Sequence, residues 1–230
     1  MNLVNLRLLL FVTVTVVALS SCGGGGGGSG SGGGKVRKGT GTAIRVVHGA
    51  IDASPVSVII GDKAVQSARY AEATVYEGVP QGPAVVRVER ANSPGVVAAE
   101  VANTFEKDTE YTLLISGRLA TGDLRYTIIP DTTVRPPVGM GSVRVFHTYV
   151  GASEISVFAG ATSLGKVSFG RATNFVDLPS GVHNIRFLNS SGGEIGSQTI
   201  ELADQGEVSI NFTGSAAFGA RFAPQHLDLD

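Results

Sequence analysis

Tryptophan is absent from this sequence of 230 residues, and cysteine occurs once. A single cysteine excludes a disulfide bond within the chain. Without tryptophan, the chain lacks the largest aromatic side chain that an exposed surface can offer for stacking on a sugar ring. The composition therefore excludes a disulfide scaffold and gives little support to a glycan site built on stacked rings.

Histidine is also scarce, and the four present do not fall into a metal-binding spacing: His48, His147, His183 and His226. Zinc sites draw on close pairs such as His-Glu-x-x-His or Cys-x-x-Cys, and neither pattern occurs. From residue 42 onward there is no Gly-x-Ser-x-Gly motif, which carries the nucleophile of many hydrolases. We therefore expect no catalytic residue, no metal, no cofactor and no enzymatic activity.

The chain has no surplus of positive charge, with 18 basic and 19 acidic residues. Removal of an N-terminal segment containing Arg7, argued next, leaves 17 basic residues against 19 acidic ones, a net charge of −2. A surface that binds nucleic acid normally needs a concentrated basic surplus to neutralise phosphates. We expect no nucleic-acid partner.

A hydrophobic run opens the chain, from Leu8 to Leu19 after the lone cation Arg7. Its length of about 12 residues suits an export signal and falls short of the roughly 20 that span a bilayer. The run ends in Leu-Ser-Ser-Cys at 19–22, which resembles the lipobox of bacterial lipoproteins. The resemblance implies that residues 1–21 are a cleaved signal peptide and that Cys22 is the lipidation site.

The residues after the cysteine predict a flexible tether and a cellular location. Gly23–Gly34 contains only glycine and serine, a composition typical of a flexible linker, and the tether is expected over residues 22–41. A phosphate-binding loop would need a preceding strand, a following helix and a terminal Lys-Ser/Thr, and none is present. Gly23 in place of aspartate implies, by resemblance to lipoprotein sorting in Gram-negative bacteria, an extracytoplasmic protein anchored in the outer membrane.

The rest of the chain is an internal repeat. Residues 44–48, Ile-Arg-Val-Val-His, recur as Val-Arg-Val-Phe-His at 143–147, an offset of 99. Apolar positions and turn residues keep this register together, which indicates two copies of one fold. We expect a first lobe over residues 42–130, a proline-rich linker over 131–141 and a second lobe over 142–230.

Within each lobe the apolar residues alternate with polar ones. Val56, Val58 and Ile60 alternate with their neighbours, and turn residues such as Gly61-Asp62 recur every 8 to 12 positions. This pattern is typical of an antiparallel sandwich in which each sheet has one solvated face. The fold class is all-β, with two tandem antiparallel Ig-like or prealbumin-like β-sandwich lobes. Strands are expected in the first lobe near residues 43–48, 55–60, 73–79, 84–90, 96–102, 110–117 and 124–129.

Two stretches carry a resemblance to a known family. Arg-Val-Val-His at 45–48 and Asp-Ala-Ser-Pro-Val-Ser-Val at 52–58 are similar to the opening of the bacterial exported family called domain of unknown function 4397. The approach to the strand at 107–114, Lys-Asp-Thr-Glu-Tyr-Thr-Leu-Leu, is also similar. The resemblance covers about 42–222 and implies exported tandem lobes without implying an activity.

The chain departs from that family pattern at three points. Gly-Ala-Ile at 49–51 replaces Ala-Ser-Pro, and Ser57 replaces an aspartate. In the second lobe Gly151 stands where the first lobe has Asp52. A function that depends on this carboxylate is therefore not expected in the second lobe.

Three groups of residues are candidates for special roles. His48 and His147 occupy one repeat position and share a strand face with apolar residues, so we expect a structural role for both. Tyr149 lies in a loop-like stretch and is the best candidate for an exposed contact. The remaining aromatic candidates fall at strand positions expected in the core: Tyr76, Tyr111, Phe169 and Phe175.

Together these features favour a lipid-anchored envelope protein that presents sandwich loops or edges to a protein partner or cell-surface polymer. Its membrane contact is expected through the lipid at Cys22. The alternative is a small-molecule or glycan-binding lipoprotein.

Overall fold

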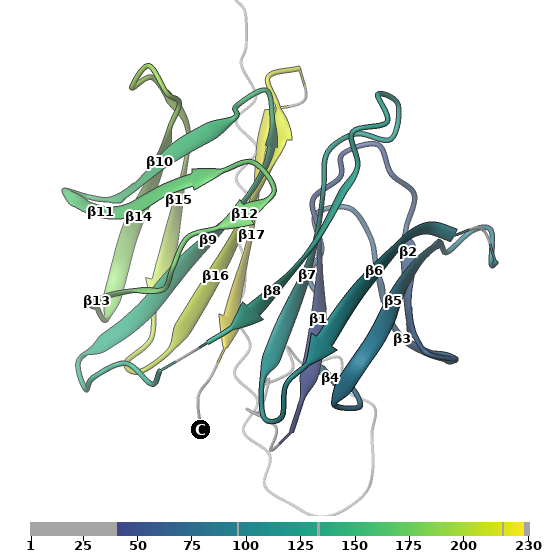
Figure 1. Cartoon of the computed structure of the whole chain (residues 1–230). Helices are drawn as coiled ribbons and strands as arrows, with labels where there is room; N and C mark the ends of the chain where they lie inside the picture. The colour runs from purple at the N-terminus through teal and green to yellow at the C-terminus, as the bar shows by residue number, and fades with distance from the viewer. Residues whose placement is uncertain (1–40, 96, 133, 218, 228–230) are drawn as a thin grey trace, which may run out of the picture. The chain divides into compact units, whose positions relative to one another are not determined.

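The computed structural model describes residues 41–95, 97–132, 134–217 and 219–227. The predicted signal peptide, Cys22 and all of the predicted tether up to residue 40 lie outside the described residues. No helix in the described part of the chain is long and apolar enough to cross a membrane. Figure 1 labels the strands, which fall into two lobes.

Lobe 1 contains eight strands in two sheets. One sheet has the order β4-β1-β7-β8 and the other β3-β2-β5-β6. The strands are β1 (Ala43–His48), β2 (Val56–Ile60), β3 (Lys63–Ala68), β4 (Glu77–Gly78), β5 (Gly82–Arg90), β6 (Val97–Phe105), β7 (Glu110–Ser116) and β8 (Arg125–Asp131).

Lobe 2 repeats this arrangement. Its sheets have the orders β12-β9-β16-β17, with β13 also paired to β9, and β11-β10-β14-β15. The strands are β9 (Met140–Val150), β10 (Glu154–Ala159), β11 (Thr162–Ser168), β12 (Arg171–Ala172), β13 (Val176–Pro179), β14 (Gly181–Leu188), β15 (Glu194–Leu202), β16 (Glu207–Ser215) and β17 (Gly219–Leu227).

The predicted fold class, two β-sandwich lobes, is confirmed, and most strand pairs are antiparallel. One pair in each lobe is parallel instead: β1 with β7, and β9 with β16. A parallel pair needs a long crossover connection. Here the crossover is made by the other sheet of the same lobe, so the first strand of each lobe lies beside a strand that comes much later in the chain.

Two features of lobe 1 differ from the expected strands. The turn Gly61-Asp62 leads into an additional strand, β3, and Gly61 adopts a left-handed φ of 61° that suits glycine in a tight hairpin. The segment expected as a strand over 73–79 forms only the short β4 and an isolated bridge between Val47 and Ala73. At the lobe boundary, β8 ends at Asp131 and β9 begins at Met140, so both strands enter the range expected as linker.

Each lobe has its own apolar core between its two sheets. The core of lobe 1 is built around residues such as Val58, Val86 and Leu113, and that of lobe 2 around Val157, Ile185 and Phe212. Along β2 the side chains alternate between buried and partly exposed, as the period of two predicts.

Four strands do not have the solvated face that alternation predicts. The residues of β1 and β16 are buried without a break, as are nearly all residues of β7 and β9. The reason is that their sheets meet between the lobes, where Val47 and Leu114 of lobe 1 pack with Phe146 of lobe 2. We call β4-β1-β7-β8 and β12-β9-β16-β17 the facing sheets, and the other two the outer sheets.

Candidate functional site

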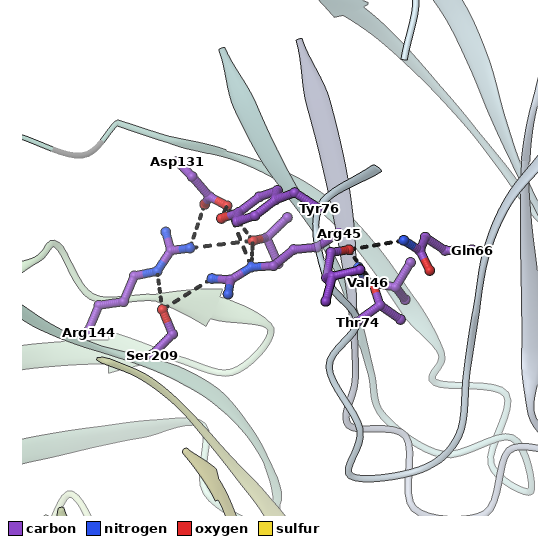
Figure 2. A network of polar contacts seen from close by, with 10 residues as sticks. Arg45, Val46, Gln66, Thr74, Tyr76, Asp131, Arg144 and Ser209 are labelled. Atoms are coloured by element: carbon purple, nitrogen blue, oxygen red, sulfur yellow. Dashed lines mark hydrogen bonds and ion pairs between the residues drawn. The ribbon is translucent and has the colours of Figure 1, made fainter. Parts of the chain in front are cut away.

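Two buried arginines connect the facing sheets. Arg45 of β1 and Arg144 of β9 occupy the same repeat position, and their exposed fractions are 0% and 2%. Arg45 donates through Nε to Thr112 Oγ1 (2.9 Å) in its own lobe and through Nη2 to Ser209 Oγ (3.1 Å) in the other lobe. Arg144 does the reverse, donating through Nε to Ser209 Oγ (3.1 Å) and through Nη2 to Thr112 Oγ1 (3.4 Å). Figure 2 shows this reciprocal arrangement.

Asp131, at the end of β8, supplies the negative charge of the same network. Its Oδ1 lies 2.6 Å from Arg144 Nη2, and its Oδ2 lies 3.8 Å from Arg45 Nε. Oδ2 also accepts hydrogen bonds from Thr112 Oγ1 (2.6 Å) and Tyr76 OH (2.5 Å). Burial raises the pKa of Tyr76 and lowers the pKa of Arg144, an effect that Asp131 opposes at the arginine. Tyr76 therefore remains a proton donor.

Aromatic rings cover the guanidinium groups. Arg144 lies 4.6 Å from the ring centroid of Phe146 and 4.5 Å from that of Phe175. Arg45 lies 4.9 Å from the centroid of Tyr76 and 5.7 Å from that of Phe146. Cation–π contacts are strongest where water is excluded, as here. The network is thus a buried polar layer that joins the lobes, and Arg144 and Phe175 at its side also line a hollow of about 550 Å³.

A second pair of cation–π contacts fastens the edges of the same interface. Arg125 of lobe 1 lies 5.5 Å from the centroid of Phe169 in lobe 2, and Arg221 of lobe 2 lies 5.9 Å from that of Tyr70 in lobe 1. The two arginines have equivalent places in their lobes, because Arg125 pairs with Ser116 and Arg221 with Thr213. The contacts are therefore related by the repeat.

The two repeat histidines are fully buried, one in each lobe. The Nε2 atom of His48 lies 3.3 Å from the carbonyl oxygen of Ser54, and that of His147 lies 2.9 Å from the carbonyl oxygen of Ala152. Burial lowers the pKa of His48 and lowers the pKa of His147 to about 4, against the raising effect of these hydrogen bonds. Each neutral ring thus joins the end of a facing-sheet strand to the loop that follows, as a structural role requires.

The structure corrects the prediction for Tyr149. It is 8% exposed within β9 and stacks on Phe212 at a centroid distance of 4.9 Å. The predicted loop is part of an 11-residue strand, which turns the ring into the core. Of the four aromatics expected in the core, Tyr111 is buried; Tyr76, Phe169 and Phe175 are partly buried around the lobe interface.

Among the described residues, no three His, Cys, Asp or Glu side chains come together as metal ligands. His183 is a surface residue whose Nε2 atom lies 2.7 Å from the carbonyl oxygen of Pro179. The side chain of His226 lies outside the described residues.

One candidate binding surface is the edge strand β6 of lobe 1. β6 is nine residues long and pairs only with β5 among the described strands. Four other edge strands carry residues that disfavour further pairing, namely Lys63 in β3, Lys166 in β11, Pro130 in β8 and Pro224 in β17. The edge strand β15 of lobe 2 has neither lysine nor proline, but it carries a glutamate near each end, Glu194 and Glu201. The β6 sequence, Val-Ala-Ala-Glu-Val-Ala-Asn-Thr-Phe, has neither lysine nor proline.

The outward face beside this edge combines exposed valines with one ion pair, in which Arg87 Nε lies 3.4 Å from Glu100 Oε1. Val85 of β5 is 49% exposed and Val97 of β6 is 44% exposed. A shallow hollow on the same outer sheet is lined by residues 83–85 of β5 and 102–104 of β6. An unprotected edge beside apolar side chains is the arrangement that accepts an added strand.

The second candidate is a cleft of about 450 Å³ between the lobes. Its lobe 1 wall is the connection between β7 and β8, residues 117–124, which we call the 117–124 loop. Its lobe 2 wall is the turn at residues 150–153 together with Ser168 and Phe169. Sequence reasoning missed this cleft because it depends on how the two lobes meet.

Asp52 holds the lobe 1 wall in place. Its Oδ1 accepts a hydrogen bond from the Leu119 amide (2.7 Å) and its Oδ2 accepts one from the Ala120 amide (3.0 Å). Burial alone would raise the pKa of Asp52, but these hydrogen bonds, with a contribution from Arg118, lower it. Gly151, at the corresponding position of lobe 2, lines the opposite wall.

Comparison with known families gives one match, and comparison with known structures gives distant ones. The family described as domain of unknown function (DUF4397) matches residues 42–158, which is all of lobe 1 and the start of lobe 2. No curated protein matches the chain.

Two solved structures are similar at low scores. One is the family 26 carbohydrate-binding module of Amy13K from Eubacterium rectale, in complex with maltoheptaose. It is 12% identical, with a TM-score of 0.28, covering 82% of this chain and 98% of that one. The other is a candidate cell adhesion protein from Bacteroides uniformis, 9% identical with a TM-score of 0.25, covering 83% of this chain and 98% of that one. Scores this low carry no functional argument.

Proposed function

The chain belongs to the family of the domain of unknown function (DUF4397), and from this premise we propose that it is a non-enzymatic, lipid-anchored cell-envelope protein that binds a protein partner. The observation that carries the proposal is the unprotected edge of β6. A partner segment that pairs with β6 would gain main-chain hydrogen bonds, and the neighbouring Val85 and Val97 would contribute apolar contact.

The packing of the lobes supports this role. The arginine network and the edge cation–π contacts fasten both lobes across one interface, so a partner at β6 meets a single unit. A preformed unit loses little conformational freedom on binding, which favours affinity.

The test is capture of partners by crosslinking in intact cells, with the lipidated chain as bait. Ala102→Lys places a charge on the outward face of β6 and should remove the partner from the captured set. Thr199→Lys, at the repeat-equivalent position of β15 in lobe 2, is the matched control and should leave capture unchanged. Capture that is the same for both variants would show that β6 is not the binding edge.

The anchor is the second part of the proposal. The Leu-Ser-Ser-Cys sequence and the short hydrophobic run support cleavage after Ser21 and lipidation of Cys22, followed by outer-membrane localisation. Replacing Cys22 with alanine should abolish incorporation of labelled fatty acid and leave an uncleaved precursor. Unchanged labelling in this variant would end the assignment.

The interlobe cleft favours a second candidate function, binding of a small molecule or glycan. Its volume of about 450 Å³ lies within the roughly 300–1,000 Å³ of small-ligand pockets, which occur preferentially between domains. A glycan array screened with the same protein separates this function from partner binding, because Ala102 is not among the residues that line the cleft and Ala102→Lys should not alter glycan binding.

A further inference from the structure

The polar groups of the interlobe cleft have a definite charge pattern. Two arginines, Arg118 and Arg125, and one carboxylate, Asp123, line it. The lining residues therefore carry one more positive than negative charge, and the Asp52 carboxylate beside the 117–124 loop interacts with Arg118. Among the described residues, Arg125 forms no ion pair, and its guanidinium group lies over an aromatic ring.

The guanidinium group of Arg125 lies over the ring of Phe169. Arg125 lies 5.5 Å from its centroid, and His147 holds Phe169 in turn by an edge-on contact at 5.6 Å and 89°. A guanidinium is planar and presents parallel N–H donors that match the two oxygens of a carboxylate. Ordering Arg125 in advance reduces the conformational entropy that binding would otherwise cost.

The opposite part of the cleft is fixed equally well. Gly117 closes the neck of the 117–124 loop with a φ of 100°, and a Cβ there would lie 2.2 Å from the Asp123 carbonyl oxygen. Arg118 donates from Nη2 to Ser215 Oγ of lobe 2 at 3.4 Å. Together with the Asp52 hydrogen bonds, these contacts keep both walls of the cleft at a defined separation.

The remaining lining suits a small polar ring. Thr121, Ser153 and Ser168 contribute hydroxyl groups, while Val150 and Ala152 contribute small apolar surface. Hydroxyl groups both donate and accept hydrogen bonds, as a sugar or a peptide end requires.

We propose that the interlobe cleft binds a small ligand through a carboxylate, which Arg125 recognises and Arg118 attracts. This inference rests on the second candidate function and names its ligand class. The carboxylate can belong to an acidic sugar or to the end of a peptide, and the two sources share the chemistry that the cleft offers.

Lobe 2 provides a matched control within the same chain. Arg221 lies over Tyr70 as Arg125 lies over Phe169, but β16 and β17 are joined by residues 216–218 alone, without a counterpart of the 117–124 loop. A variant of Arg221 therefore removes an equivalent contact between the lobes without touching the cleft.

The experiment is titration of the purified lipidated chain in detergent by calorimetry, at low salt. The probes are D-glucuronate with D-glucose as its neutral counterpart, and an acetylated tripeptide with a free C-terminus against the same peptide amidated. Binding of either acid without its neutral counterpart supports the proposal and identifies the source of the carboxylate. Equal binding of acid and neutral forms, or binding of neither acid, overturns it.

Three variants complete the test. Arg125→Gln should weaken binding of the acid about tenfold or more, the loss expected for a bidentate charge-assisted contact. Arg221→Gln should leave it within twofold, and Asp123→Asn should strengthen it several-fold by removing the opposing charge. An equal loss in Arg125→Gln and Arg221→Gln would assign both residues to lobe packing and overturn the proposal. Because none of these residues lies in β6, the β6 capture experiment can fail or succeed independently.

Discussion

The two lobes share one sheet order and one set of interface residues, yet they fill their cores differently. Lobe 2 stacks Tyr149, Phe187 and Phe212, with ring centroids 4.9 Å and 4.3 Å apart. The same repeat positions in lobe 1 are Ala50, Val88 and Ile115. The lobe 1 core has its aromatic pair elsewhere, in Phe105 and Tyr111, where lobe 2 has Leu202 and Val208.

The different positions of the aromatic residues show which features the fold requires and which can vary. Total core volume must be filled, but large side chains can lie at either end of a sandwich. The interface arginines allow no such freedom, because each one must reach the hydroxyl group of the opposite lobe. Arg45 and Arg144 are therefore identical in the two lobes where most core residues are not.

The two lobes differ most in their loops, and the interlobe cleft lies where the loops differ. Asp52 and the 117–124 loop of lobe 1 have no counterpart in lobe 2, where Gly151 and residues 216–218 take their places. The β6 edge carries one glutamate, Glu100, which pairs with Arg87 of β5, whereas β15 carries two, Glu194 and Glu201. The interface is duplicated, whereas the cleft combines a lobe 2 wall with the 117–124 loop, which only lobe 1 has.

The largest expected loss of stability is at the two buried arginines, one from each lobe. Arg144→Ala should lower the free energy of unfolding by about 3–5 kcal/mol, because it leaves Asp131 buried without its closest charge partner. Arg45→Ala should cost less, since Arg45 Nε lies 3.8 Å from the carboxylate whereas Arg144 Nη2 lies 2.6 Å from it. Urea denaturation of both variants measures the difference. Equal losses would mean that the two arginines are energetically equivalent despite their distances.

A second test lies where corresponding residues of the two lobes touch. A Cβ on Gly49 would lie 2.1 Å from Oγ1 of Thr148, the residue at the same repeat position in lobe 2. Gly49→Ala should therefore destabilise the chain by about 1–3 kcal/mol through overpacking. Adding Thr148→Gly should recover part of this loss, as measured by a double-mutant cycle in urea. Additive effects of the two changes would contradict the contact.

The contact also explains why glycine replaces the family's alanine at position 49. The sequence alone does not reveal the cause of this departure, because the cause is a residue 99 positions away in the other lobe. Arg45 is a similar case. Alternation placed it correctly on the face opposite Val46, but it could not tell that this face meets a second sheet instead of water. The repetition of the arginine in both lobes was the available signal.

Local patterns predicted the sandwich well but gave no strand order within the sheets. Alternation located β1, β2, β5 and β7 closely, because each is apolar on its inward face. It missed β3, whose sequence Lys-Ala-Val-Gln-Ser-Ala is mostly polar and exposed. It placed Tyr149 in a loop because Gly151 follows so closely, although β9 continues to Val150. The parallel pairing of β1 with β7 depends on topology, which periodicity does not encode.

The two buried histidines allow the lobes to be compared by the pH dependence of their stability. The pKa of His147 is lowered to about 4 by burial, below the usual 6.5, so the folded state disfavours the protonated ring. Its contribution to stability is complete above pH 6.5 and is lost as pH falls toward 4, which amounts to about 2 kcal/mol by pH 5. His147→Gln retains a donor for the Ala152 carbonyl but does not titrate. Denaturation at pH 7 and pH 5 should show a smaller decrease in this variant than in the unmodified chain.

His48 should show the same sign of effect. Burial is again the largest cause and lowers its pKa, while the hydrogen bond to Ser54 and the charge of Glu72 oppose the change. His48→Gln should thus also reduce the loss of stability between pH 7 and pH 5, and the effect should be the smaller of the two because Glu72 favours the protonated ring. A greater effect at His48 than at His147 would reverse the comparison between the lobes.

The smallest expected loss of stability is at Asp52, whose place in lobe 2 is taken by Gly151. Asp52→Ala removes two hydrogen bonds from the 117–124 loop, but the carboxylate is exposed, so the cost should be less than about 1 kcal/mol. Because the folded-state pKa of Asp52 is lowered, its contribution is present above about pH 4, the ordinary value for aspartate, and is lost as pH falls through the folded-state pKa. Amide hydrogen exchange at Leu119 and Ala120 measures the change directly, and exchange should accelerate in Asp52→Ala at pH 7. Unaltered exchange in Asp52→Ala would show that the loop is ordered without its carboxylate.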